Sequence, residues 1–227
     1  MYPVVPGDVL AGGWETICFG ITLIGALAVG DSVLLGGGWM SNDGGHAITY
    51  VVDRVSQETF RFVVCNTGQG VNYHPCNAAE TPKMKYKNAI GITGLSEKRI
   101  TDEAWWLAVY TQFVMPNKEH TPARFYEKFL PLLAQQPLES AFAETVDDPA
   151  FDWRSPQRAG TCYFRCVFEA LHYLCRRRGL TSAQTKLFKF ALRFEMLMMA
   201  RADLDVVKEI ADSDRRLVRI TCQQLAY

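Results

Sequence analysis

The chain has 227 residues, of which 48% are hydrophobic and 21% are charged, as expected for a globular protein with enough apolar material for a core. Lys and Arg together number 24, as do Asp and Glu, so the formal net charge is zero. This balance favours neither nucleic acid nor a membrane surface, and we expect neither as a partner.

The seven cysteines are odd in number, and no signal-peptide pattern precedes them. These features favour a reducing, intracellular environment, with a cytoplasmic location, over a disulfide framework. The most apolar run, residues 17–29, has only thirteen residues, whereas a membrane span needs about 20. We interpret this run as a buried helix or a pair of core segments.

Two strands are predicted in the first half of the chain. Residues 47–52 and 59–65 are rich in β-branched and aromatic side chains. The polar segment 53–58 separates them and predicts a hairpin. A glycine-rich segment, 36–45, precedes the first strand and is predicted to form a loop, and residues 66–75 are rich in turn formers.

The pattern becomes helical from about residue 101. Thr101 and the two acids after it predict the start of one helix, and Thr121 followed by proline predicts another. Residues 137–160 contain prolines and acids and are interpreted as a long connecting loop.

Three more helices are predicted toward the C-terminus. One extends from the cap at Thr161 to about Arg178 and ends at Gly179. A longer one begins at Thr181 and includes a stripe of Met and Phe over 187–199, interpreted as core, and a last helix begins near residue 204. The whole pattern predicts an α+β fold in one domain, with a sheet-rich part over about 1–95 and a helical part over about 96–227.

The segment SPQRAGTCYFRC, residues 155–166, carries the first candidate for chemistry. Cys162 falls in the first turn of a predicted helix, where free backbone N–H groups and the dipole stabilise a nucleophilic thiolate. Its own N–H and the side-chain amide of Gln157, five residues earlier, are placed to stabilise an oxyanion. Cys166 lies one turn further and is expected to pack in the core. The ordinary alternative for Cys162 is a buried structural cysteine.

A nucleophilic cysteine needs a base, and His46 is the best candidate. It stands between the glycine-rich segment and the first predicted strand, whereas His172 lies too far along the helix and His120 is expected to be solvated. Asn66 follows the paired strand, so an antiparallel hairpin brings it near His46, where its amide oxygen can orient the ring. Taken separately, His46 is a loop histidine and Asn66 a turn former.

Together these blocks resemble the papain-like cysteine peptidase superfamily. GHAITYVV and FRFVVCNTGQG are similar to its His and Asn strands, and QRAGTCYF to its oxyanion segment and nucleophile helix. The Gly-Thr-Cys-Tyr portion resembles the ubiquitin-specific proteases, which have Asn in place of Gln157. The order, with the nucleophile last, is similar to the ubiquitin-like-protein and adenovirus-type proteases.

This resemblance implies a papain-like fold, with a small sheet packed on a helical subdomain and the nucleophile at a helix N-terminus. It also implies a thiol-dependent peptidase or isopeptidase without a cofactor, acting on ubiquitin, a ubiquitin-like protein or another polypeptide as a deubiquitinase or a related protease. The expected catalytic residues are Cys162, His46, Asn66 and Gln157. The expected substrate-binding residues are Trp39, Gly44, Gly45 and Gly160. The glycine-rich segment with Trp39 would line a narrow channel that suits an extended tail of small residues.

Three alternatives stay open. A zinc site could be formed by His74 and Cys76 with Cys65 or His46, but the spacing does not match the usual paired ligands, and we expect no metal. A non-catalytic binding module could share the fold. A cysteine-dependent acyltransferase or transglutaminase-like enzyme could use the same residues for transfer in place of hydrolysis.

Overall fold

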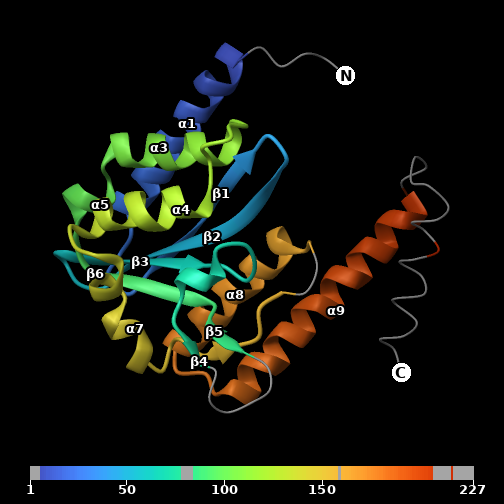
Figure 1. Cartoon of the computed structure of the whole chain (residues 1–227). Helices are drawn as coiled ribbons and strands as arrows, with labels where there is room; N and C mark the ends of the chain where they lie inside the picture. Colours follow the sequence, from blue (N-terminus) through green and yellow to red (C-terminus); the bar gives the residue numbers. More distant parts are fainter. Residues whose placement is uncertain (1–5, 78–83, 158–159, 207–215, 217–227) are drawn as a thin grey trace. The chain divides into compact units, whose positions relative to one another are not determined.

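A four-stranded antiparallel sheet organises the first of two units into which the chain divides, Met1–Leu174 and Cys175–Tyr227. The computed structural model describes residues 6–77, 84–157, 160–206 and 216. The fold is α+β, as predicted (Figure 1). In spatial order the strands are β1 (Ser32–Ser41), β2 (Gly44–Arg54), β3 (Thr59–Cys65) and β6 (Ala89–Ser96). A smaller sheet contains β4 (Cys76–Asn77), β5 (Lys85–Lys87) and β7 (Trp153–Arg154).

The strands predicted at 47–52 and 59–65 form β2 and β3, and their antiparallel pairing confirms the hairpin. The glycine-rich segment 36–45 differs from the prediction, because most of it is strand in β1 and the start of β2. Gly37 explains why glycine is used within a strand here. A Cβ at this position would lie 2.1 Å from the ring of Tyr50, so the ring packs directly on the backbone.

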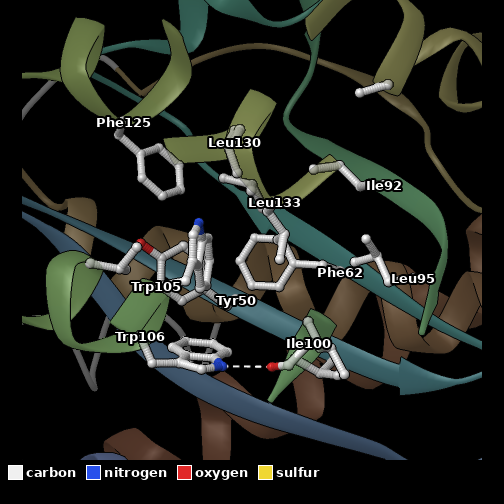
Figure 2. Packing of buried hydrophobic residues seen from close by; sticks show 14 of the residues in the cluster. Tyr50, Phe62, Ile92, Leu95, Ile100, Trp105, Trp106, Phe125, Leu130 and Leu133 are labelled. Carbon is white, nitrogen blue, oxygen red and sulfur yellow. Dashed lines mark hydrogen bonds between the residues drawn. The ribbon is translucent and has the colours of Figure 1, made fainter. Parts of the chain in front are cut away.

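Side chains of the sheet alternate between two cores, as the two-residue period of a strand requires. On one face Tyr50 and Phe62 pack against Trp105 and Trp106, and Figure 2 shows these rings together with the hydrogen bond from Trp106 Nε1 to the Ile100 carbonyl, 2.7 Å. On the opposite face lies a second cluster, which contains Val51, Val63, Cys65, Ala170 and Tyr173.

The helices between β6 and residue 134 contribute to the core cluster that contains Tyr50 and Phe62. The start predicted at Thr101 is one residue off, because Asp102 is the cap: its Oδ1 accepts from the Trp105 N–H at 2.9 Å, while Thr101 ends the preceding helix. The predicted start at Thr121 is confirmed, since Thr121 Oγ1 accepts from the Arg124 N–H at 3.2 Å. The elements are α2 (Glu97–Ile100), α3 (Glu103–Val114), α4 (Pro122–Arg124), the π-helical turn η2 (Phe125–Phe129) and α5 (Leu130–Ala134).

Helix α1 (Pro6–Gly25) contains most of the apolar run 17–29, and this run is less buried than expected. Ile17 and Ile24 are buried, but Phe19 is 65% exposed, so only one stripe of the helix contributes to the core. Among the described residues, no helix combines the length and apolarity that crossing a membrane requires.

The predicted loop 137–160 also differs, since it contains α6 (Leu138–Ala141), α7 (Ala143–Asp147) and β7. These short helices depend on tertiary contacts that local sequence does not reveal. The hydroxyl of Thr145 is an example: it accepts from the Gly91 N–H at 3.0 Å and donates to the Gly91 carbonyl at 3.2 Å.

Helix α8 (Cys162–Arg177) begins directly after Thr161 and is followed by Gly179 at φ +81°, as predicted. Two hydrogen bonds join it to β2: Thr49 Oγ1 donates to Cys166 Sγ at 3.2 Å, and Tyr173 Oη donates to Asp53 Oδ2 at 2.5 Å. From the first bond to the second, the residue number increases along β2 (Thr49 to Asp53) and also along α8 (Cys166 to Tyr173), so α8 runs parallel to β2. Its first residue therefore lies toward the end of β2 that carries His46.

The second unit contains α9 (Ser182–Val206). Thr181 caps it as predicted, since its hydroxyl accepts from the Gln184 N–H while Gln184 Oε1 accepts from the Thr181 N–H. The Met and Phe stripe of 187–199, expected to be core, is largely exposed, with Met199 at 67%. The last predicted helix, from residue 204 onward, lies almost wholly outside the described residues.

Candidate active site

His46 and Asn66 form a buried pair at one end of the β2–β3 hairpin. His46 follows the two glycines that open β2, and Asn66 follows the last residue of β3. Since Thr49 is paired with Cys65, the hairpin brings the two side chains together, and the His46 Nε2 to Asn66 Oδ1 distance is 2.8 Å. Only 5% of His46 is exposed.

The hydrogen bonds around Asn66 determine which ring nitrogen of His46 carries the proton. The Gly68 N–H donates to Oδ1 at 3.0 Å, while Asn66 Nδ2 donates to the Gln69 carbonyl at 2.7 Å and to Tyr126 Oη at 3.0 Å. Oδ1 is therefore the acceptor facing His46, and Nε2 must be the donor. In the neutral ring this leaves Nδ1 as the basic nitrogen, and it makes no hydrogen bond with any described residue.

Burial lowers the pKa of His46, because it disfavours the charged ring, and the Asn66 hydrogen bond opposes this effect. The ring is therefore neutral at neutral pH, the form that accepts a proton. Trp39 covers it, with ring centroids 5.2 Å apart, and Trp39 Nε1 donates to Gln69 Oε1 at 2.8 Å.

The expected substrate-binding residues divide into buried and exposed ones. Trp39 is only 2% exposed, so it shields the His46–Asn66 pair in the core, and this burial argues against a channel-lining role. Gly44 and Gly45 are exposed where β2 begins, and Gly44 has φ +140°, a conformation that L side chains rarely adopt. Gly160 is exposed, with no atom within 4 Å of an ideal Cβ.

Gln157 is held beside this pair by the loop that follows Asn66. Its N–H donates to the Thr67 carbonyl at 2.6 Å, and its Oε1 accepts from Thr67 Oγ1 at 3.0 Å. With Oε1 occupied, the donor Nε2 is the free end of the amide, and no described residue accepts a hydrogen bond from it. The predicted donor type is therefore available beside His46.

Gly68 shows how closely the two side chains approach each other. An ideal Cβ on this residue would lie 2.4 Å from Gln157 Nε2 and 2.7 Å from His46 Cε1. Any side chain at this position would displace one of the two. Thr67 and Gly68 were not singled out as site residues from the sequence, although they lie in the turn-rich segment directly after Asn66.

Cys162 is the first residue of α8 and is partly exposed. Its thiol has no hydrogen-bond partner among the described residues, so the structure does not join it to His46. The parallel course of α8 and β2 places both residues toward the same end of the two elements. Of the four expected catalytic residues, the structure brings His46, Asn66 and Gln157 together, with Gln157 held by Thr67 beside the hydrogen-bonded His46–Asn66 pair, and Cys162 has no contact that joins it to them.

Cys166 packs in the core, as expected from the sequence. It is buried, it accepts a hydrogen bond from Thr49, and burial raises the pKa of its thiol. The structure therefore favours a protonated, unreactive thiol at this position.

The other histidines have structural partners. His120 was expected to be solvated, but it is buried and its Nδ1 contacts the Met115 carbonyl at 2.7 Å. His172 Nε2 lies 2.7 Å from Asp152 Oδ2. Both nitrogens of His74 are engaged, by the Lys87 carbonyl and Tyr126 Oη, which leaves none for a metal. Across the described part of the chain, no three His, Cys, Asp or Glu residues are grouped to hold a metal ion.

No protein-family model, curated protein or solved structure matches the chain. The resemblance to papain-like peptidases therefore depends on the short sequence blocks. The local geometry adds a His–Asn pair with a free basic nitrogen and an amide donor close to the ring.

Proposed function

We propose that the chain is a cysteine peptidase of the papain-like type, with Cys162 as nucleophile, His46 as base, Asn66 as the residue that orients the ring and Gln157 as oxyanion donor. The observation that carries this proposal is the buried His46–Asn66 hydrogen bond, in which Nε2 is committed to Asn66 and Nδ1 is left free. A ring held in this way presents one defined lone pair to a thiol.

In the proposed reaction, His46 Nδ1 removes the proton of the Cys162 thiol, and the thiolate attacks a peptide or isopeptide carbonyl. The oxyanion accepts hydrogen bonds from Gln157 Nε2 and the Cys162 N–H. The imidazolium then protonates the leaving amine as the C–N bond breaks and a thioester remains. Water loses a proton to His46, attacks the thioester, and releases a carboxylic acid and the thiol.

Three observations support Cys162 over the other cysteines as the nucleophile. It is the first residue of α8, where free backbone N–H groups stabilise a thiolate. It is partly exposed, whereas Cys166 and Cys65 are buried. The segment that leads to it is attached, through Gln157 and Thr67, to the loop that carries Asn66.

The proposed substrate class is ubiquitin or a ubiquitin-like protein, cleaved as a deubiquitinase or related protease would cleave it. This part comes from the resemblance of the Gly-Thr-Cys-Tyr segment and of the His-before-Cys order. Gly44 and Gly45, just before His46, and Gly160, just before Cys162, are exposed. Their backbone is therefore accessible to an extended tail.

A non-catalytic binding module with the same fold is the second candidate. The observation that favours it is the missing hydrogen bond between Cys162 and His46, which an assembled ion pair would form. The two candidates differ in the reactivity they assign to Cys162.

Alkylation by iodoacetamide, followed by peptide mass spectrometry, distinguishes them. The exposed Cys76 supplies an internal reference for an ordinary thiol. We expect Cys162 to react about 10-fold faster than Cys76, and His46→Ala to remove this advantage. Equal rates at the two cysteines in the folded wild type would refute the catalytic proposal.

A panel of ubiquitin-like activity probes then tests the substrate class. The expected adduct forms on Cys162 and is lost in Cys162→Ala. Cys166→Ala is the matched control, because it removes a thiol one helical turn away. It should keep the adduct at a stability cost of about 1–2 kcal/mol. Fast alkylation without any adduct would refute ubiquitin-like substrates but not the nucleophile.

A further inference from the structure

A chain of hydrogen bonds extends from the His46–Asn66 pair into the core. Asn66 Nδ2 donates to Tyr126 Oη at 3.0 Å, and this oxygen lies 2.8 Å from His74 Nε2. His74 Nδ1 in turn lies 2.6 Å from the Lys87 carbonyl. Asn66 and Tyr126 have no exposed surface, and His74 is nearly fully buried. None of these groups can exchange its partner for water.

The direction of every bond in this chain is determined. The Lys87 carbonyl can only accept, so His74 Nδ1 carries a proton. A fully buried imidazole without a carboxylate partner is neutral, which makes Nε2 an acceptor. Tyr126 must therefore donate its hydroxyl proton to His74, and its oxygen is left to accept from Asn66 Nδ2. A flipped Asn66 amide would place its oxygen against the Tyr126 oxygen and its N–H groups against those of His46 and Gly68.

The Tyr126 ring is fixed independently of this chain. It belongs to the π-helical turn η2 and stacks on Tyr73, with centroids 4.8 Å apart and planes at 5°. Its other faces contact Trp39 and Phe125 edge-on. These ring contacts hold the hydroxyl within hydrogen-bond distance of both Asn66 Nδ2 and His74 Nε2.

We propose that Tyr126 and His74 are positioning residues that hold the Asn66 amide and, through it, the Nε2-protonated form of the His46 ring. The effect on thiol chemistry depends on the proposed function; the effect on the ring does not. Neither residue touches the reacting atoms. Their contribution is to exclude the amide orientation that would leave Nδ1 of His46 protonated and unable to act as a base.

The test uses the full chain with ¹⁵N-labelled histidine, and proton–nitrogen NMR assigns the ring tautomers. In the wild type we expect His46 protonated at Nε2 and His74 at Nδ1. Tyr126→Phe keeps the ring contacts and removes only the hydroxyl. It should speed exchange of the His46 ring proton with water about 10-fold and slow Cys162 alkylation by a similar factor.

His74 provides a matched pair of variants. His74→Gln retains an acceptor for the Tyr126 hydroxyl and should keep the His46 ring close to the wild type. His74→Leu removes the acceptor and should behave like Tyr126→Phe. If the His46 ring proton is unchanged in both Tyr126→Phe and His74→Leu, the positioning role is refuted. If the ring responds but Cys162 alkylation never depends on His46, the positioning role stands and the proposed function fails.

Discussion

His74 makes the stability of the fold depend on pH in a way that one substitution can isolate. Burial lowers the pKa of this residue from 6.5 to about 4, although the hydrogen bond to the Lys87 carbonyl opposes the shift. Between these two values the unfolded chain binds more protons at this position than the folded chain. The contribution of neutral His74 to the free energy of unfolding is therefore complete above pH 6.5 and is lost as the pH falls toward 4.

The magnitude follows from the difference between the two pKa values. At about 1.4 kcal/mol for each pKa unit, the full effect is about 3 kcal/mol, and about 2 kcal/mol of it is lost by pH 5. This pH lies above the ordinary pKa of most carboxylates, so these groups contribute little to the change over the interval. His46, whose pKa is also lowered, contributes equally to both proteins in a comparison that changes only His74.

Urea unfolding at pH 7.5 and pH 5.0 measures this effect in the wild type and in His74→Gln, which cannot titrate. The variant is expected to be less stable at pH 7.5. We expect the free energy of unfolding to fall by about 2 kcal/mol more in the wild type than in the variant between the two pH values. Equal losses in the two proteins would refute the buried, neutral state of His74.

Two further predictions concern Gln157 and Tyr173. If Gln157 Nε2 stabilises the oxyanion, Gln157→Ala should lower kcat by about 10²–10³-fold and leave KM nearly unchanged, and an unchanged kcat on any cleaved substrate would refute this role. Tyr173→Phe removes the hydroxyl that donates to the buried Asp53 carboxylate, so the free energy of unfolding should fall by about 1–3 kcal/mol. Urea titration checks the second, and a change below about 0.3 kcal/mol would contradict it.

The parts of the fold that sequence reasoning predicted correctly depend on local chemistry. β-branched and aromatic runs gave β2 and β3, and the hydroxyl caps at Thr121 and Thr181 gave helix starts. These signals work because a strand or a cap is determined by a few neighbouring residues. The proximity of His46 and Asn66 was predictable for the same reason, since one hairpin connects them.

The structure differs from the sequence-based predictions where contacts between residues far apart in the sequence determine the local conformation. In β1, Gly37 leaves room for the Tyr50 ring to pack on the strand backbone, and α6 and α7 form in a segment that has the composition of a loop. His120 follows a segment that looks exposed in the sequence, yet it is buried and its Nδ1 contacts the Met115 carbonyl, five residues earlier. Tyr126 and His74 were not identifiable as partners of Asn66, because their contacts require the positions of η2 and of the turn before β4.

The attachment of α8 to β2 also bears on how the chain is synthesised. The two bonds that hold them together, Thr49 to Cys166 and Tyr173 to Asp53, span 117 and 120 residues of sequence. Until the ribosome has released the helix, the strand side chains Val51, Val63 and Cys65 lack the cover of Ala170 and Tyr173 and have only Ala89, Ala150 and Phe151 from the rest of their cluster. A chain that stalls before this point exposes an apolar sheet face and is prone to aggregate. The last helix to be made in this unit is thus the one that protects the nascent sheet, and a chaperone that shields β2 and β3 should raise the yield of folded protein.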